Sequence, residues 1–174
     1  LIYPYKVVSD EMTKKILFLF LFVLFVLVGC HRPTQFSNEA LQEKFLGFNQ
    51  QELTFKTILS KHKGNKILID VWASWCNDCI VTLSDLKKLQ EENPAVHFVF
   101  LSLDKSIERW KKAVERLQIT GDHYYMMEGK KGAFGDFLNL WWIPRYVVVN
   151  ESGEITLFKA TKITDKNILE ALKK

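Results

Sequence analysis

Cysteine is scarce in this sequence, and its positions leave no room for a structural disulfide framework. The 174 residues contain three cysteines, Cys30, Cys76 and Cys79. Small folds held together by disulfides carry many cysteines. Two thiols separated by only two residues close a loop too small to add much stability. We therefore expect Cys76 and Cys79 to carry chemistry.

The sequence also lacks a strong excess of either charge. It has 24 Lys+Arg against 20 Asp+Glu, a formal net charge of +4, with no basic stripe of the kind that would predict a nucleic-acid partner. Hydrophobic residues make up 48% and charged residues 25%, close to the average for globular proteins, which argues against disorder, collagen-like repeats and a polytopic membrane protein. The length and the absence of internal repeats predict one domain.

The sequence has one long apolar run, Ile16–Val28, which Lys14 and Lys15 precede. Thirteen residues at about 1.5 Å each are too short for the hydrocarbon core of a bilayer. A basic segment followed by such a run is typical of a secretory signal peptide. The sequence predicts a signal peptide over residues 1–29, in which residues 1–11 are an over-extended start before Met12.

The end of this run has no Ala-x-Ala cleavage site. Instead Leu27-Val28-Gly29-Cys30 resembles the bacterial lipobox. The resemblance implies that Cys30 is acylated, becomes the mature N-terminus and anchors the chain to a membrane of the bacterial cell envelope, facing the periplasm. Residues 30–44 would then be the anchored N-terminus and tether, and residues 45–174 the folded domain. The alternative is a plain membrane anchor with an incidental cysteine.

Hydrophobic patterning predicts an α/β fold. Continuous β-rich segments indicate buried strands over 66–72 and 96–103, and a hairpin signal joins strands over 146–150 and 154–158. An edge strand or turn is expected over 52–55 and a short strand or loop over 123–127. Helices are expected over 40–45, 55–62, 78–92, 106–117 and 131–140, with a last one capped by Thr164.

The motif Trp75-Cys76-Asn77-Asp78-Cys79 directly follows the predicted buried strand over 66–72. Two intervening residues at the start of a helix bring the two sulfurs within disulfide distance. Cys76 would lie at the helix N-terminus, where unpaired N–H groups stabilise the attacking thiolate. Cys79, one turn further in, is suited to resolving a mixed disulfide.

A lone CxxC is also half of a zinc site. Zinc requires a second pair of ligands, and His62, His97 and His123 are isolated from one another in the sequence. A copper-relay site would likewise need an additional His or Met. We therefore expect no metal and no cofactor beyond a redox-active disulfide between Cys76 and Cys79.

These residues resemble a known family. The segment 67–79, Ile-Leu-Ile-Asp-Val-Trp-Ala-Ser-Trp-Cys-Asn-Asp-Cys, is similar to the active-site segment of thioredoxins. Together with the lipobox-like segment, the chain resembles the membrane-anchored TlpA-like thiol–disulfide oxidoreductases over about residues 45–172. The resemblance implies the thioredoxin fold, a central mixed β-sheet flanked by helices on both faces.

The resemblance also implies residue roles. Cys76 would be the nucleophile and Cys79 the resolving thiol. Pro144 would be the family's cis-proline facing the disulfide, with the Ile143 backbone and Trp75 contributing to substrate binding. Asp70 matches a buried acid beneath the second cysteine and would accept its proton. Alternatively, Asp70 is a structural polar residue at the end of a strand, with its hydrogen bonds made within the fold.

Two departures from the family pattern bear on the chemistry. Asp78 replaces the usual proline before the second cysteine, so we expect Asn77 and Asp78 to tune the redox potential. Phe100 occupies the position of the lysine that pairs with the buried acid. Without that lysine, Asp70 is expected to have a raised pKa.

The resulting functional prediction is an extracytoplasmic reductase of protein disulfides. Its substrates would be disulfide-bearing envelope proteins, and a membrane thiol transporter would supply electrons, since the envelope has no glutathione pool. Two alternatives remain open. A peroxiredoxin-like thiol peroxidase would require Thr and Arg around its reactive cysteine, which Cys76 lacks. A non-enzymatic binding module or metal chaperone would use the CxxC only for capture.

Overall fold

The computed structural model describes residues 11–20 and 32–173. Residues 11–20 are helical, and a compact unit extends from Pro33 to the C-terminus. No helix within these ranges is long and apolar enough to cross a membrane. The predicted acylation site, Cys30, and most of the predicted signal peptide lie outside the described residues, so both remain predictions.

The compact unit is built on a seven-stranded mixed sheet with the order β2-β1-β5-β4-β3-β6-β7. Strands β3, β4 and β5 are parallel, whereas β6 is antiparallel to β3 and pairs with β7 in the predicted hairpin. The strands are β1 (Lys44–Gly47), β2 (Glu52–Thr54), β3 (Ile67–Trp72), β4 (His97–Ser102), β5 (Asp122–Met126), β6 (Arg145–Val149) and β7 (Ile155–Ala160).

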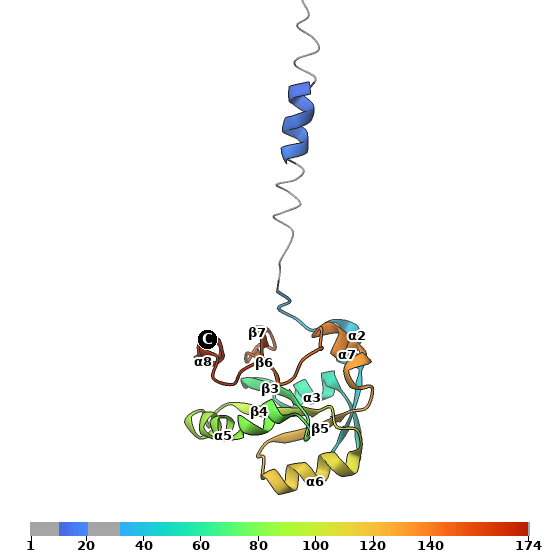
Figure 1. Cartoon of the computed structure of the whole chain (residues 1–174), viewed down its shortest axis with the longest axis vertical. Helices are drawn as coiled ribbons and strands as arrows, with labels where there is room; N and C mark the ends of the chain where they lie inside the picture. Colours follow the sequence, from blue (N-terminus) through green and yellow to red (C-terminus); the bar gives the residue numbers. More distant parts are fainter. Residues whose placement is uncertain (1–10, 21–31, 174) are drawn as a thin grey trace, which may run out of the picture. The chain divides into compact units, whose positions relative to one another are not determined.

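Helices cover both faces of this sheet, and α6 lies on the side opposite α2 and α7 (Figure 1). Because β3 is buried along its whole length, its alternating side chains contribute to two cores. One core joins Leu68 and Trp72 to α5, α6 and α8, and the other joins Ile69 and Val71 to α2, α3 and α7. The helices are α2 (Asn38–Gln42), α3 (Phe55–Lys61), α4 (Asn77–Val81), α5 (Leu83–Glu92), α6 (Ile107–Leu117), α7 (Ala133–Phe137) and α8 (Lys166–Lys173).

The segment before residue 45 differs from the expected tether. Phe36 and Ala40 are buried, and the Phe36 ring packs against Phe55 at 4.8 Å and Phe137 at 5.4 Å. The expected helix over 40–45 ends at Gln42, and Phe45 lies in β1. Residues 33–44 therefore belong to the compact unit, because their apolar side chains complete its second core.

Two helix boundaries also differ from the sequence prediction. The expected helix over 78–92 is divided at Thr82, whose hydroxyl donates to the carbonyls of Asp78 and Cys79, a side-chain bond that bends helices. The last helix begins after Asp165, whose carboxylate accepts the Asn167 N–H, and not after Thr164. In place of the expected helix over 131–140, a 3-10 turn, Gly129–Lys131, precedes the short α7.

Candidate active site

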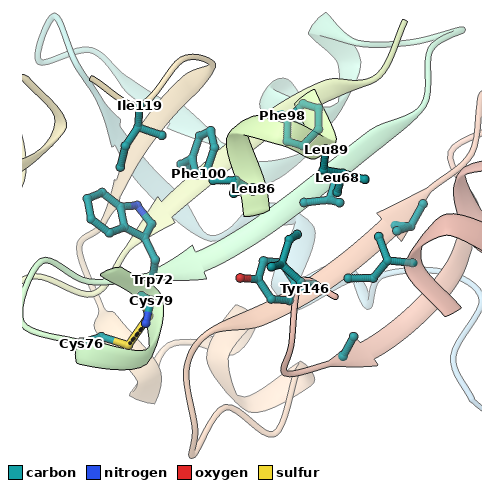
Figure 2. Close-up of a cluster of buried hydrophobic side chains, with 14 of the residues drawn as sticks. Leu68, Trp72, Cys76, Cys79, Leu86, Leu89, Phe98, Phe100, Ile119 and Tyr146 are labelled. Carbon is teal, nitrogen blue, oxygen red and sulfur yellow. Dashed lines mark hydrogen bonds between the residues drawn. A yellow bond between two sulfur atoms is a disulfide. The ribbon is translucent and has the colours of Figure 1, made fainter. Parts of the chain in front are cut away.

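The CxxC motif lies where β3 ends and α4 begins, and its cysteines form a disulfide with their Cα atoms 5.3 Å apart. Cys76 is the N-cap of α4, and its sulfur accepts the Cys79 N–H at 3.1 Å. Figure 2 shows this bond beside the disulfide, at one end of the core formed by β3 and α5. The arrangement is the one predicted from the spacing, since an N–H group is already directed at the Cys76 sulfur.

The burial of the two cysteines is nearly equal. Cys76 is 7% exposed and Cys79 is 5% exposed, so burial alone does not separate their roles. What distinguishes the sulfurs is their surroundings. Cys76 borders a surface groove and Cys79 does not.

This groove, about 320 Å³ in volume, runs between the CxxC turn and the segment before β6. The Ile143–Pro144 peptide bond is cis, and the Ile143 carbonyl oxygen lies 3.7 Å from the Cys76 sulfur. Ile143 is half-buried, whereas Asn77 and Asp78 are exposed. The groove is lined by Trp75, Cys76, Asn77, Asp78, Trp141, Trp142 and Ile143, so it brings together most of the predicted site residues.

Asp70 is the buried carboxyl group of the site. It projects from β3 between Leu68 and Trp72, on the sheet face that packs with Cys79, and is paired in register with Phe100 on β4. Its Oδ1 has no hydrogen-bonding partner. Burial raises the pKa of Asp70 from its ordinary value to about 8, because desolvation disfavours the charged form. The predicted rise in pKa is confirmed, and the carboxyl group retains its proton at neutral pH.

The other register partner of Asp70 is Tyr146 on β6. Tyr146 is buried, and burial raises the pKa of its hydroxyl. The hydroxyl contacts Thr82, and Figure 2 shows its oxygen on the side of the Tyr146 ring that faces Trp72 and Cys79. Because Thr82 donates to the Cys79 carbonyl, Tyr146 links the centre of the sheet to the end of α4.

A second buried carboxylate, which was not predicted from the sequence, holds the residue that precedes the motif. Asp104 accepts hydrogen bonds from the Ser74 N–H at 3.1 Å, from the Ser74 hydroxyl at 2.6 Å and from the Ser102 hydroxyl at 2.9 Å. Ser74 precedes Trp75, while Ser102 and Asp104 stand at the end of β4. The sequence signal was available, since β3 and β4 are adjacent parallel strands whose carboxyl ends meet at one edge.

His62 and His97 are less isolated than the sequence suggested. The buried His62 has its Nε2 2.9 Å from the Asp122 carboxylate, and its ring lies 4.8 Å from that of His97. Within residues 11–20 and 32–173, no three His, Cys, Asp or Glu side chains converge as metal ligands would.

A mixed sheet with helices on both faces, a CxxC disulfide at the start of a helix and a cis-proline opposite define a thioredoxin-fold protein built for thiol–disulfide exchange. The sequence profile of a thioredoxin-like family matches residues 64–155. The chain therefore belongs to the thioredoxin-like family, and it is a thiol–disulfide oxidoreductase.

Individual relatives agree with this assignment. The chain is 27% identical to the thioredoxin-like protein YneN of Bacillus subtilis over 67% of this chain and 69% of that protein. It is 30% identical to the thiol:disulfide interchange protein DsbE of Haemophilus influenzae over 64% of this chain and 59% of that protein.

Solved structures confirm the predicted fold. A protein of Bacteroides vulgatus assigned as a thiol–disulfide oxidoreductase is 30% identical, with a TM-score of 0.64 over 79% of this chain and 88% of that chain. A secreted disulfide oxidoreductase of Mycobacterium tuberculosis, described as homologous to Escherichia coli DsbE, is 17% identical. Its TM-score is 0.58 over 79% of this chain and 98% of that chain.

Proposed function

We propose that this oxidoreductase works outside the cytoplasm as a reductase of protein disulfides, anchored through an acylated Cys30. The lipobox-like segment supports the anchor. The matched DsbE of Haemophilus influenzae is named a thiol:disulfide interchange protein, and the similar Mycobacterium tuberculosis protein is described as secreted. In the bacterial envelope, disulfide-bearing proteins would be the substrates and a membrane thiol transporter the electron donor.

The observation that carries the proposal is the position of the Cys76 sulfur. It accepts the N–H of Cys79 and borders the groove beside cis-Pro144. When the pair is reduced, the same N–H favours the Cys76 thiolate over the thiol. Cys79 does not line the groove, so Cys76 is the sulfur that a substrate disulfide reaches first.

The exchange then proceeds in two displacements. The Cys76 thiolate attacks one sulfur of the substrate disulfide, forming a mixed disulfide while the other substrate sulfur leaves as a thiolate. Cys79 next gives its proton to Asp70 and attacks the Cys76 sulfur, releasing the second substrate thiolate. Two electrons pass to the substrate, and the Cys76–Cys79 disulfide remains for the donor to reduce.

In this scheme Asp70 must be ionised to accept the proton. With the pKa of Asp70 at about 8, only a minor fraction is ionised at pH 7. A base whose pKa lies near the working pH is ionised in a useful fraction of molecules and still has enough driving force to accept a proton. The resolving step should therefore accelerate as pH rises toward 8, whereas attack by Cys76 does not depend on Asp70.

Trapping of the mixed disulfide tests these roles. In a Cys79→Ser variant, mixed disulfides between Cys76 and substrate should accumulate, because the second displacement is lost. A Cys76→Ser variant is the matched control and should trap little. Equal trapping by both variants would contradict the assignment of Cys76 as the attacking thiol.

Insulin reduction tests the direction of the reaction. With dithiothreitol as electron donor, the wild-type protein should accelerate precipitation of the reduced insulin B chain, and Cys76→Ser should remove the acceleration. A wild-type rate equal to that of dithiothreitol alone would contradict the reductase proposal.

A further inference from the structure

Two tryptophans beside the disulfide are left in solvent by the fold. Trp141 is 68% exposed and Trp142 is 49% exposed. With Trp75, itself exposed, they form the wall of the groove that borders Cys76. An indole normally supplies a large area to a core or an interface, and clustered exposed apolar side chains mark interaction sites. None of the exchange steps described above uses Trp141 or Trp142.

The loop that carries these tryptophans is held at its base. The Leu140 N–H donates to the Gly135 carbonyl at 2.9 Å, and the Leu140 side chain is buried. The buried Arg145, which follows cis-Pro144, donates from Nη1 to the Leu138 carbonyl at 2.7 Å. These anchors on either side leave the two indoles projecting from a fixed backbone.

The Trp141 and Trp142 rings face different directions, because they are inclined at 63° with centroids 6.3 Å apart.

The groove also differs from the rest of the chain in its charge. Asp78 is the only charged residue among those that line it, although the whole chain carries a net charge of +4. Indole faces beside one carboxylate are complementary to a cation, since indole is the preferred aromatic partner of ammonium and guanidinium groups.

We propose that the Trp141–Trp142 pair and Asp78 select substrate segments in which the reacting cysteine is flanked by a lysine or arginine. The inference rests on the proposed reductase function. A side chain next to the cysteine bonded to Cys76 enters the groove beside the tryptophans. Its cationic end then meets indole faces and the Asp78 carboxylate, while its methylene stem covers apolar surface.

Three disulfide peptides of identical sequence, except for Lys, norleucine or Glu beside one cysteine, test the proposal. The second-order rate constant for their reduction by the pre-reduced protein should fall in the order Lys, norleucine, Glu. Rate ratios between peptides are the informative quantity, because they cancel changes in the intrinsic reactivity of Cys76. A cation–π contact at an exposed site corresponds to about a two- to fivefold change, so a Lys-to-norleucine ratio of about two to five is expected.

Variants assign this selectivity to residues. Trp141→Ala and Trp142→Ala should each lower the Lys-to-norleucine ratio by about twofold or more. Asp78→Asn should lower the Lys-to-Glu ratio and remove most of its dependence on ionic strength, because salt screens an exposed charge. Leu169→Ala removes a comparably exposed apolar side chain on α8, away from the groove, and should leave the ratios unchanged.

The possible outcomes separate the two proposals. Equal reduction of all three peptides would overturn the selectivity while leaving the reductase function intact. Fastest reduction of the norleucine peptide would overturn it in favour of an apolar segment. Wild-type ratios retained in both tryptophan variants would remove Trp141 and Trp142 from the explanation. Failure to reduce any peptide, or insulin, would contradict the proposed function itself.

Discussion

At the scale of single residues, the proposed exchange involves two carboxyl groups in opposite environments. Asp70 is buried in β3 and has an oxygen without a hydrogen-bonding partner, whereas Asp78 is exposed in the first turn of α4. Burial keeps the first group neutral at pH 7, and exposure leaves the second free to act through its charge. Each environment leads to its own prediction.

Asp70 should make the stability of the oxidised protein depend on pH. Its pKa is about 8 in the folded chain, against an ordinary value of 3.8, so between these values the folded state binds a proton that the unfolded state lacks. Stability therefore falls as pH rises from about 4 to 8, by up to about 1.4 kcal/mol per pH unit. Asp70→Asn should remove this slope.

Denaturant unfolding of the oxidised protein at pH 5, 6, 7 and 8 measures the effect. The advantage of Asp70→Asn over wild type should widen with pH across this series. Asp85→Asn, which replaces an exposed carboxylate on α5, should keep the wild-type slope. Parallel stability curves for Asp70→Asn and wild type would contradict a buried, protonated Asp70.

Asp78 should make the Cys76–Cys79 pair more reducing. Its negative charge repels a thiolate on Cys76 and so destabilises the reduced form. Asp78→Asn is expected to lower the pKa of the reduced Cys76 thiol and to raise the reduction potential by at most a few tens of millivolts. Thiolate absorbance followed against pH reports the first change, and an unchanged or higher pKa in the variant would exclude this electrostatic effect.

At the scale of elements, Asp104 fixes the turn that carries the motif. It joins the end of β4 to Ser74, at the end of β3, through hydrogen bonds to a backbone N–H and a hydroxyl. Because Asp104 is buried, loss of its charge would weaken several bonds that water cannot replace. Asp104→Asn should therefore lower the free energy of unfolding by about 1–3 kcal/mol.

A double-mutant cycle separates this interaction from general damage. Asp104→Asn and Ser74→Ala should show a coupling energy of about 0.5–3 kcal/mol, as expected for residues in one hydrogen-bond network. Asp85→Asn combined with Ser74→Ala should be additive. Additivity of the Asp104 and Ser74 variants would show that the turn does not depend on this pair.

The features that could be predicted were those that depend on a short local sequence pattern and not on contacts between distant residues. The buried strand β3, the CxxC turn and the N-cap Ser106 of α6 each depend on a short local pattern, and the structure has them where they were expected. The Asp104–Ser74 contact was missed because its partners lie on different strands. The Glu43 carboxylate that accepts the Phe134 N–H near the start of α7 was missed for the same reason, since the partners are 91 positions apart.

At the scale of the whole molecule, the compact unit includes residues 33–44, which were expected to form part of a tether. Polar residues around Pro33 suggested a linker, but Phe36 joins an aromatic cluster with Phe55 and Phe134. One buried aromatic residue in a polar segment produces no periodic pattern. Its partners could be identified only after the sheet and α7 were in place.

This packing predicts how the chain tolerates truncation. Residues 33–174 should unfold cooperatively and reduce insulin, because they contain both cores. Residues 45–174 should be less stable by several kcal/mol, since loss of one buried phenylalanine alone costs about 3–5 kcal/mol, and the Glu43 bond to α7 is lost as well. Equal denaturant midpoints for the two fragments would show that residues 33–44 add nothing to the fold.

The equilibrium between the Cys76–Cys79 pair and glutathione measures whether the pair is poised to reduce protein disulfides. A reductase should form an intramolecular disulfide with a reduction potential closer to that of thioredoxin, about −270 mV, than to that of a strong oxidant such as DsbA, about −120 mV. We expect a potential near the thioredoxin value, and Cys76→Ser should abolish the couple. A potential near the oxidant value would contradict the reductase direction, and stable mixed disulfides with glutathione in place of an internal bond would contradict the role of Cys79.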